Sequence, residues 1–138
     1  MLDERIYESY IGILKEEMVP AMGCTEPIAL AYGAARAREV LGKEPEHITA
    51  KCSGNIIKNV RCVIIPNSDG LTGIEAGVVL GAVAGNASLN MEVLSNVNEF
   101  ERKRCRELLD KKICNVELLD SPVVLHFIIE MQAGDDTV

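Results

Sequence analysis

Apolar residues recur along this chain with two periodicities, and each periodicity predicts a different kind of element. Spacings of three and four residues place Ile6, Tyr10, Ile13 and Leu14 on one face of an amphipathic helix. A long run of Ala, Leu, Ile and Gly then predicts a buried second helix, which follows a loop at residues 18–26. In all, we expect helices over residues 3–17, 27–41, 72 onward, 90–97 and 98–112.

Alternation of apolar and polar residues predicts the strands. Within residues 47–53, Ile48, Ala50 and Cys52 face one way and the intervening residues face the other. We expect further strands over residues 60–65, 116–119 and 122–131, the last two joined by a tight turn at Asp120-Ser121. Helices and strands cluster rather than alternate, so residues 1–138 are expected to form a single α+β domain. Its sheet would be mainly antiparallel, with about four strands packed against Ala/Gly-rich helices.

The third helix carries glycine at every fourth position, namely Gly73, Gly77, Gly81 and Gly85. Each glycine costs about 1 kcal/mol relative to Ala inside a helix, so close backbone approach must offset the cost. The second helix has its own stripe of small residues at Ala29, Gly33 and Ala37, and we expect the two stripes to pack together. Thr72 and Glu75 have the spacing of a capping box at the start of the third helix.

The charge balance narrows the class of partner. The chain has 14 Lys and Arg against 21 Asp and Glu, a net charge of −7, with no basic stripe. This argues against binding nucleic acid or an anionic membrane surface. The longest uncharged stretch, residues 76–91, is too short and too polar to span a bilayer, and no secretory signal is evident.

The five cysteines do not form a framework, because their number is odd and no two are spaced as Cys-x-x-Cys. A reducing cytoplasm fits this pattern better than an oxidising compartment. Four of the cysteines and both histidines have ordinary structural interpretations, mostly as strand or helix core, and we expect no catalytic role for Cys52, Cys62, Cys105, Cys114, His47 and His126.

Cys24 is the strongest chemical candidate. It lies just before the second helix, whose free N–H groups favour a thiolate at that end. Pro20 and Gly23 shape the approach, and Thr25 and Glu26 add a hydroxyl and a carboxylate. The alternative is a buried, inert cysteine with Thr25 as the N-cap, and position alone favours that alternative.

A second polar run, residues 53–59, is expected to form a loop between two strands. It combines Ser53, Asn55, Lys58 and Asn59, which together can grip the carboxylate and amino groups of a small amino acid. Gly54 lets the backbone come close to a ligand. The alternative is an ordinary polar connection with Asn-driven turns.

The runs PAMGCTEPIA at residues 20–29 and SGNIIKNV at residues 53–60, followed by Ile65-Pro66 and the glycine-rich helix, resemble the L-cysteine desulfidase family. That family is related to the catalytic alpha chains of iron–sulfur L-serine dehydratases, and the resemblance covers nearly the whole chain. It implies a carbon–sulfur lyase that converts L-cysteine to pyruvate, sulfide and ammonia, using an oxygen-sensitive [4Fe–4S] cluster rather than pyridoxal phosphate.

The resemblance also implies roles for individual residues. Cys24 would be a cluster ligand or the base that takes the substrate's α-proton, with Glu26 as a second catalytic group. The substrate-binding residues would be Thr25, Ser53, Asn55, Lys58 and Asn59.

Family members are much longer, and their further cluster cysteines lie downstream. We therefore expect this chain to be an N-terminal part or subunit, partnered by the C-terminal remainder, without a cluster or lyase activity alone. Two alternatives stay open, namely a lyase acting on L-serine and a non-catalytic domain that binds a small ligand. Association of several copies also stays open.

Overall fold

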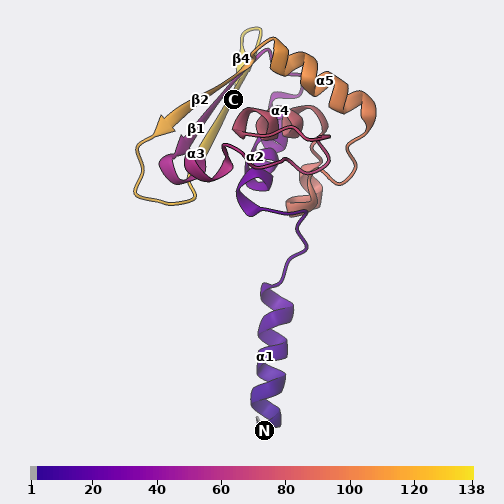
Figure 1. The fold of residues 1–138 in the computed structure, drawn as a ribbon, viewed down its shortest axis with the longest axis vertical. Coiled ribbons are helices and arrows are strands. Elements are labelled where there is room, and N and C mark those ends of the chain that lie inside the picture. The colour runs from indigo at the N-terminus through magenta and orange to yellow at the C-terminus, as the bar shows by residue number, and fades with distance from the viewer. Residues whose placement is uncertain (1–2) are drawn as a thin grey trace.

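Six helical elements and four strands make up the computed structural model, which describes residues 3–138 (Figure 1). In chain order they are α1 (Glu4–Glu17), α2 (Thr25–Leu41), β1 (His47–Ser53), α3 (Gly54–Val60), α4 (Ile74–Ala84), the 3-10 helix η1 (Ala87–Glu92), α5 (Glu99–Asp110), β2 (Cys114–Leu119), β3 (Phe127–Ala133) and β4 (Asp136–Thr137). The expected α+β class is confirmed.

The sheet has the strand order β2-β1-β3-β4 and is mixed rather than purely antiparallel. β1 runs parallel to β2 and antiparallel to β3, and β3 runs antiparallel to β4. The predicted hairpin at Asp120-Ser121 is therefore wrong, because β1 lies between the two strands that the turn was expected to join. The alternation in β1 is confirmed, since Ile48, Ala50 and Cys52 are all buried. Because β1 pairs with β2 along one edge and with β3 along the other, it is an inner strand of the sheet.

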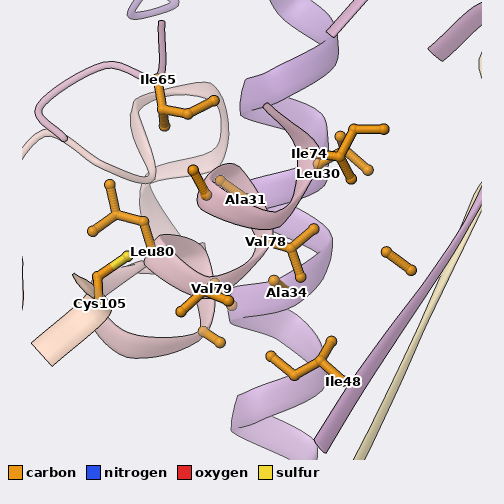
Figure 2. Close-up of a cluster of buried hydrophobic side chains, with 14 of the residues drawn as sticks. Leu30, Ala31, Ala34, Ile48, Ile65, Ile74, Val78, Val79, Leu80 and Cys105 are labelled. Atoms are coloured by element: carbon orange, nitrogen blue, oxygen red, sulfur yellow. The ribbon is translucent and has the colours of Figure 1, made fainter. Parts of the chain in front are cut away.

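Close contact between α2 and α4 fills the core (Figure 2). A Cβ at Gly81 would lie 2.3 Å from the carbonyl oxygen of Ala31, and one at Gly85 would lie 2.7 Å from the Cβ of Ala35. The predicted backbone approach along the glycines of α4 is confirmed. Ala31 and Ala35 are completely buried, so these small side chains let the two helices touch.

The face of α2 that meets α4 differs from the prediction. The glycines of α4 meet the row Pro27, Ala31 and Ala35, and not the row through Ala29, Gly33 and Ala37. Gly33 points at the sheet instead, where an added Cβ would lie 2.6 Å from the ring of Phe127. Because α2 is packed between α4 and β3, it needs small residues on two faces, and sequence spacing alone did not assign them.

Residues 54–65 depart most from the expected structure. The predicted polar loop is the helix α3, and the predicted strand over residues 60–65 is absent. Ile56 and Val60, one helical turn apart, are both fully buried, which explains the helix. After α3 only an isolated bridge between Ile64 and Thr72 forms.

The helix ends show which residues cap them. Asn98 and Glu101 form a capping box at the start of α5, and Gly42 ends α2 in the left-handed conformation. The capping box at Thr72 is wrong, because Gly73 is the N-cap of α4 with φ of 93°, a value that glycine adopts readily. The helix expected over residues 90–97 is replaced by η1.

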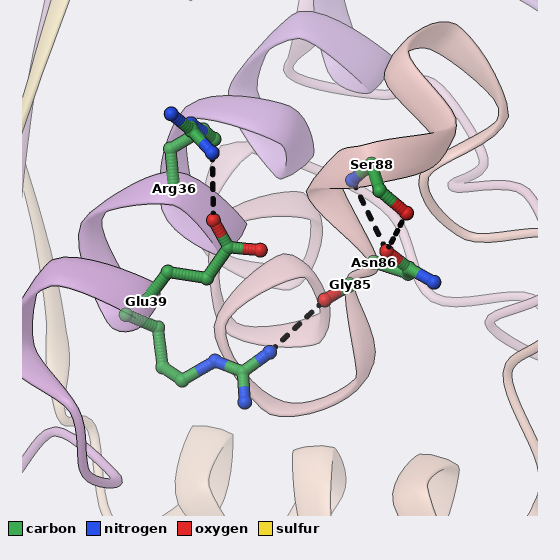
Figure 3. Close-up of polar contacts among 6 residues, drawn as sticks. Arg36, Glu39, Gly85, Asn86 and Ser88 are labelled. Carbon is green, nitrogen blue, oxygen red and sulfur yellow. Dashed lines mark hydrogen bonds and ion pairs between the residues drawn. The ribbon is translucent and has the colours of Figure 1, made fainter.

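A hydrogen bond joins the C-terminal half of α2 to the end of α4, beside two local polar contacts (Figure 3). The guanidinium of Arg38 donates a hydrogen bond of 3.0 Å to the carbonyl oxygen of Gly85. Next to it, Arg36 and Glu39 form a surface ion pair of 2.8 Å. The Asn86 side chain then accepts from the backbone N–H of Ser88 and starts η1. Of these contacts, the hydrogen bond from Arg38 to Gly85 joins α2 to the end of α4, while the other two lie within α2 and at the start of η1.

α1 extends away from the rest of the molecule, joined to α2 by an extended linker (Figure 1). None of its side chains is buried, and Asp3 caps its first turn by accepting from the N–H of Arg5. Over residues 3–138, no helix combines the length and apolar character needed to cross a membrane.

Candidate functional site

Cys24 is the N-cap residue of α2, with an extended backbone and no capping hydrogen bond from its side chain. Its thiol is exposed, so the alternative of a buried cysteine with Thr25 as the cap is wrong. Gly23, with φ of 149°, turns the chain into the helix, and a Cβ there would lie 3.6 Å from the side chain of Pro66. The thiol is therefore presented at the positive end of a 17-residue helix.

The carboxylate of Glu26 is held between two polar groups. The thiol of Cys24 lies 3.7 Å from Oε2, within reach of a weak S–H donor, and the amide of Asn59 donates a 2.8 Å hydrogen bond to Oε1. Asn59 is 33 residues further along the chain, on α3. The tertiary structure thus brings together the two polar runs identified in the sequence.

The polar face of α3 explains this contact. Asn55, Lys58 and Asn59 are spaced by three and four residues, so they lie on one side of the helix. Ile56 and Val60 occupy the opposite, buried side. Because Asn59 contacts Glu26, this polar side faces the N-terminus of α2. Lys58 is exposed and Asn55 is half-buried there.

Ser53 does not join this group of side chains. It is 2% exposed at the end of β1, and its hydroxyl donates a 2.7 Å hydrogen bond to the carbonyl of Val124. That hydrogen bond fixes the segment before β3 against the sheet. The expected exposed loop is absent, and the Ser53 side chain contributes to the structure rather than to the candidate site. Thr25, by contrast, is exposed in the first turn of α2 beside the site.

Three of the other cysteines lie in more buried surroundings than Cys24. Burial raises the pKa of the Cys52 thiol to about 11, and burial likewise raises the pKa values of Cys105 and Cys114 to about 12. Cys62 is exposed in the turn after α3, so its predicted place on a core strand is wrong.

A [4Fe–4S] cluster requires three or four thiolates around one point. Among residues 3–138, no three side chains of His, Cys, Asp or Glu converge in a way that can hold a metal. Cys24 has the exposure that a ligand needs, but the described residues do not complete a cluster site. A cluster bound here would need further ligands from outside them.

Two further features of the structure, near the sheet and beside α3, were not indicated by the sequence. The hydroxyl of Ser121 lies 2.8 Å from Nδ1 of His126, in the connection that was predicted to be a strand. A hollow of about 220 Å³ opens beside α3, lined in part by Ile57, Ile74 and Val116. Since Ile57 and Asn59 project from opposite sides of α3, this hollow is separate from the Cys24 site.

Comparison with known proteins shows that the chain is similar to proteins described only as UPF0597 proteins. One from Desulfitobacterium hafniense is 47% identical over 135 residues, which is 98% of this chain and 31% of that protein. One from Treponema denticola is 46% identical over 136 residues, and one from Vibrio campbellii is 36% identical over 133 residues. The chain spans about a third of the length of these relatives.

That description states no activity, substrate or partner. No family model matches the chain, and no solved structure matches it.

Proposed function

We propose that this chain supplies one half of the active site of an iron–sulfur-dependent lyase that converts L-cysteine and water to pyruvate, sulfide and ammonia. The observation that carries the proposal is the contact of Glu26 with both Cys24 and Asn59. It unites an exposed thiol, a carboxylate and an amide at a helix N-terminus, and the residues come from the two runs that resemble the L-cysteine desulfidase family.

The proposed role of Cys24 is to remove the α-proton of the substrate or to ligate the cluster. In the first case the thiol gives its own proton to Glu26, which lies 3.7 Å away, and the thiolate then takes the proton from the α-carbon. The carbon–sulfur bond breaks, and its electron pair leaves with the sulfur as hydrosulfide. The remaining aminoacrylate is hydrolysed by water to pyruvate and ammonia. The α2 N-terminus stabilises the thiolate that this role requires.

Asn59, Asn55 and Lys58 are proposed to orient the substrate. Lys58 is exposed and positively charged, which suits the carboxylate of an amino acid. Asn59 holds Glu26 in place through its 2.8 Å hydrogen bond, so it positions the carboxylate as well as lining the site. The cluster, when bound, supplies a Lewis acid for the leaving group.

The test is the complete protein, reconstituted with iron and sulfide without oxygen and assayed for sulfide and pyruvate from L-cysteine. Cys24→Ala is expected to lower turnover by at least about a hundredfold, the range for losing a general base. Cys62→Ala is the matched control, because Cys62 is also exposed but lies outside the contacts of Glu26. Full activity in the Cys24→Ala protein would contradict the assignment.

The same preparation separates the two alternatives. Faster turnover of L-serine than of L-cysteine would identify a dehydratase-like lyase. Binding of a small amino acid without turnover, and without loss in the Cys24→Ala protein, would identify a non-catalytic ligand-binding domain.

A further inference from the structure

α1 presents a wide apolar face that nothing in the described chain covers. Ile6, Tyr7, Tyr10, Ile13 and Leu14 are between 46% and 57% exposed, and α1 packs against no other described element. Exposing such a face in water is unfavourable by roughly 25 cal/mol for each Å² of apolar surface. A cluster of this kind is typical of an interaction site rather than of an ordinary solvent-exposed helix.

The shape of this face indicates what covers it. At about 100° per residue, the apolar side chains including Ile11 span an arc of about 160°. The opposite arc has no large apolar side chain and holds Glu4, Arg5, Glu8, Ser9, Gly12, Lys15 and Glu16, whereas Glu17, in the last turn, falls within the apolar arc. A two-stranded coiled coil uses a narrower seam, whereas an arc of this width is typical of a helix seated on a globular body.

The position of α1 in the chain gives a second indication of what covers its apolar face. It ends at Glu17, seven residues before the exposed thiol of Cys24, so a polypeptide that covers the C-terminal end of α1 lies within about 25 Å of the candidate site. About two thirds of each relative's chain lies outside the part that matches.

We infer that the apolar face of α1 docks onto the polypeptide that the relatives carry outside the matched third, and so brings that polypeptide to Cys24. The inference rests on the proposed function only for the identity of the completed site, because the docking itself requires no catalysis. It assigns to α1 the role of joining the matched third to the remainder of such a protein.

Amide hydrogen exchange tests the inference by comparing the complete protein with the 138-residue chain. We expect residues 4–17 to exchange at least about tenfold more slowly in the complete protein, because docking adds stability that a free helix lacks. Ile13→Glu, on the apolar face, is expected to abolish this slowing. Gly12→Glu introduces the same charge one residue away on the polar face, where an added Cβ meets nothing within 4 Å, and is expected to preserve it.

The outcomes separate the possible partners of α1. Fast exchange of residues 4–17 in the complete protein overturns the inference. Slow exchange already present in the 138-residue chain, rising with concentration together with a dimeric mass, also overturns it and identifies a second copy as the partner. Slow exchange in the complete protein with an inactive site retains the docking and refutes only the proposed function.

Discussion

α4 and α1 are helices of similar length with opposite surroundings. α4 has 11 residues, eight of them buried, while α1 has 14 residues and none buried. The local sequence of α1 favours a helix, whereas the Gly- and Val-rich sequence of α4 does not, and α4 instead is packed against α2 and α5 within the described chain. The contrast teaches that the body around α2 and α4 contains its own stabilising contacts, to which α1 adds no buried side chain.

The largest expected effect is at the contact between α2 and α4. Gly81→Val places its Cβ where the backbone oxygen of Ala31 lies 2.3 Å away, and a backbone atom cannot rotate aside as a side chain does. We expect a loss of about 5 kcal/mol or more in the free energy of unfolding, enough to prevent folding of a typical domain. Gly12→Ala in α1 is the control, and it should leave the unfolding of the body unchanged. Urea unfolding followed by circular dichroism measures both.

Replacing a leucine by alanine in each of the two helices is expected to give the next largest difference in the free energy of unfolding. Leu80 in α4 is completely buried, so Leu80→Ala is expected to lower the free energy of unfolding by about 3 kcal/mol. Leu14 in α1 is 49% exposed, and Leu14→Ala should change it by less than about 0.5 kcal/mol. Equal losses for the two variants of the 138-residue chain would show that α1 is part of the same core.

Thiol reactivity distinguishes the regions chemically. In the native chain at pH 8, Cys24 and Cys62 should react rapidly with a disulfide reagent, because both are exposed. Burial raises the pKa values of Cys105 and Cys114 to about 12 and that of Cys52 to about 11, so their thiolates are scarce at this pH. These three should react at least about a hundredfold more slowly until the chain unfolds. More than two fast thiols in the native chain would contradict the burial pattern.

The smallest expected effect is at a surface ion pair of the body. A hydrogen bond from Arg104 holds the pKa of the Glu44 carboxyl below its ordinary value of 4.5. The ionised form is therefore favoured by folding, so the stabilisation is present above pH 4.5 and is lost as the pH falls through the lowered value. Glu44→Gln should cost about 0.5 kcal/mol at pH 7, because both partners remain substantially solvated. The difference between the two proteins in thermal unfolding should vanish in acid and shrink in high salt.

The candidate site was predictable in its parts but not in its arrangement. Sequence indicated Cys24 and Glu26 at a helix start, and that position is confirmed. It predicted a loop for the run containing Asn59, since Gly and Asn favour turns, but burial of Ile56 and Val60 overrides this preference and gives α3. Without α3, no local rule indicates that Asn59 reaches Glu26. Ser53 was selected for its chemistry, and its burial against Val124 depends on contacts from residues far along the chain.

The sequence by itself determined the elements whose signals are local. Periodicity placed α1 and β1, and a long run of small apolar residues placed α2. The sequence also predicted α5, and the glycine repeat indicated that α4 is approached closely by another backbone. Tertiary structure alone decided which face of α2 meets α4, that β1 separates β2 from β3, and that α3 carries Asn59 to Glu26. These features depend on which apolar surfaces bury one another, and that choice is a property of the whole chain rather than of any segment within it.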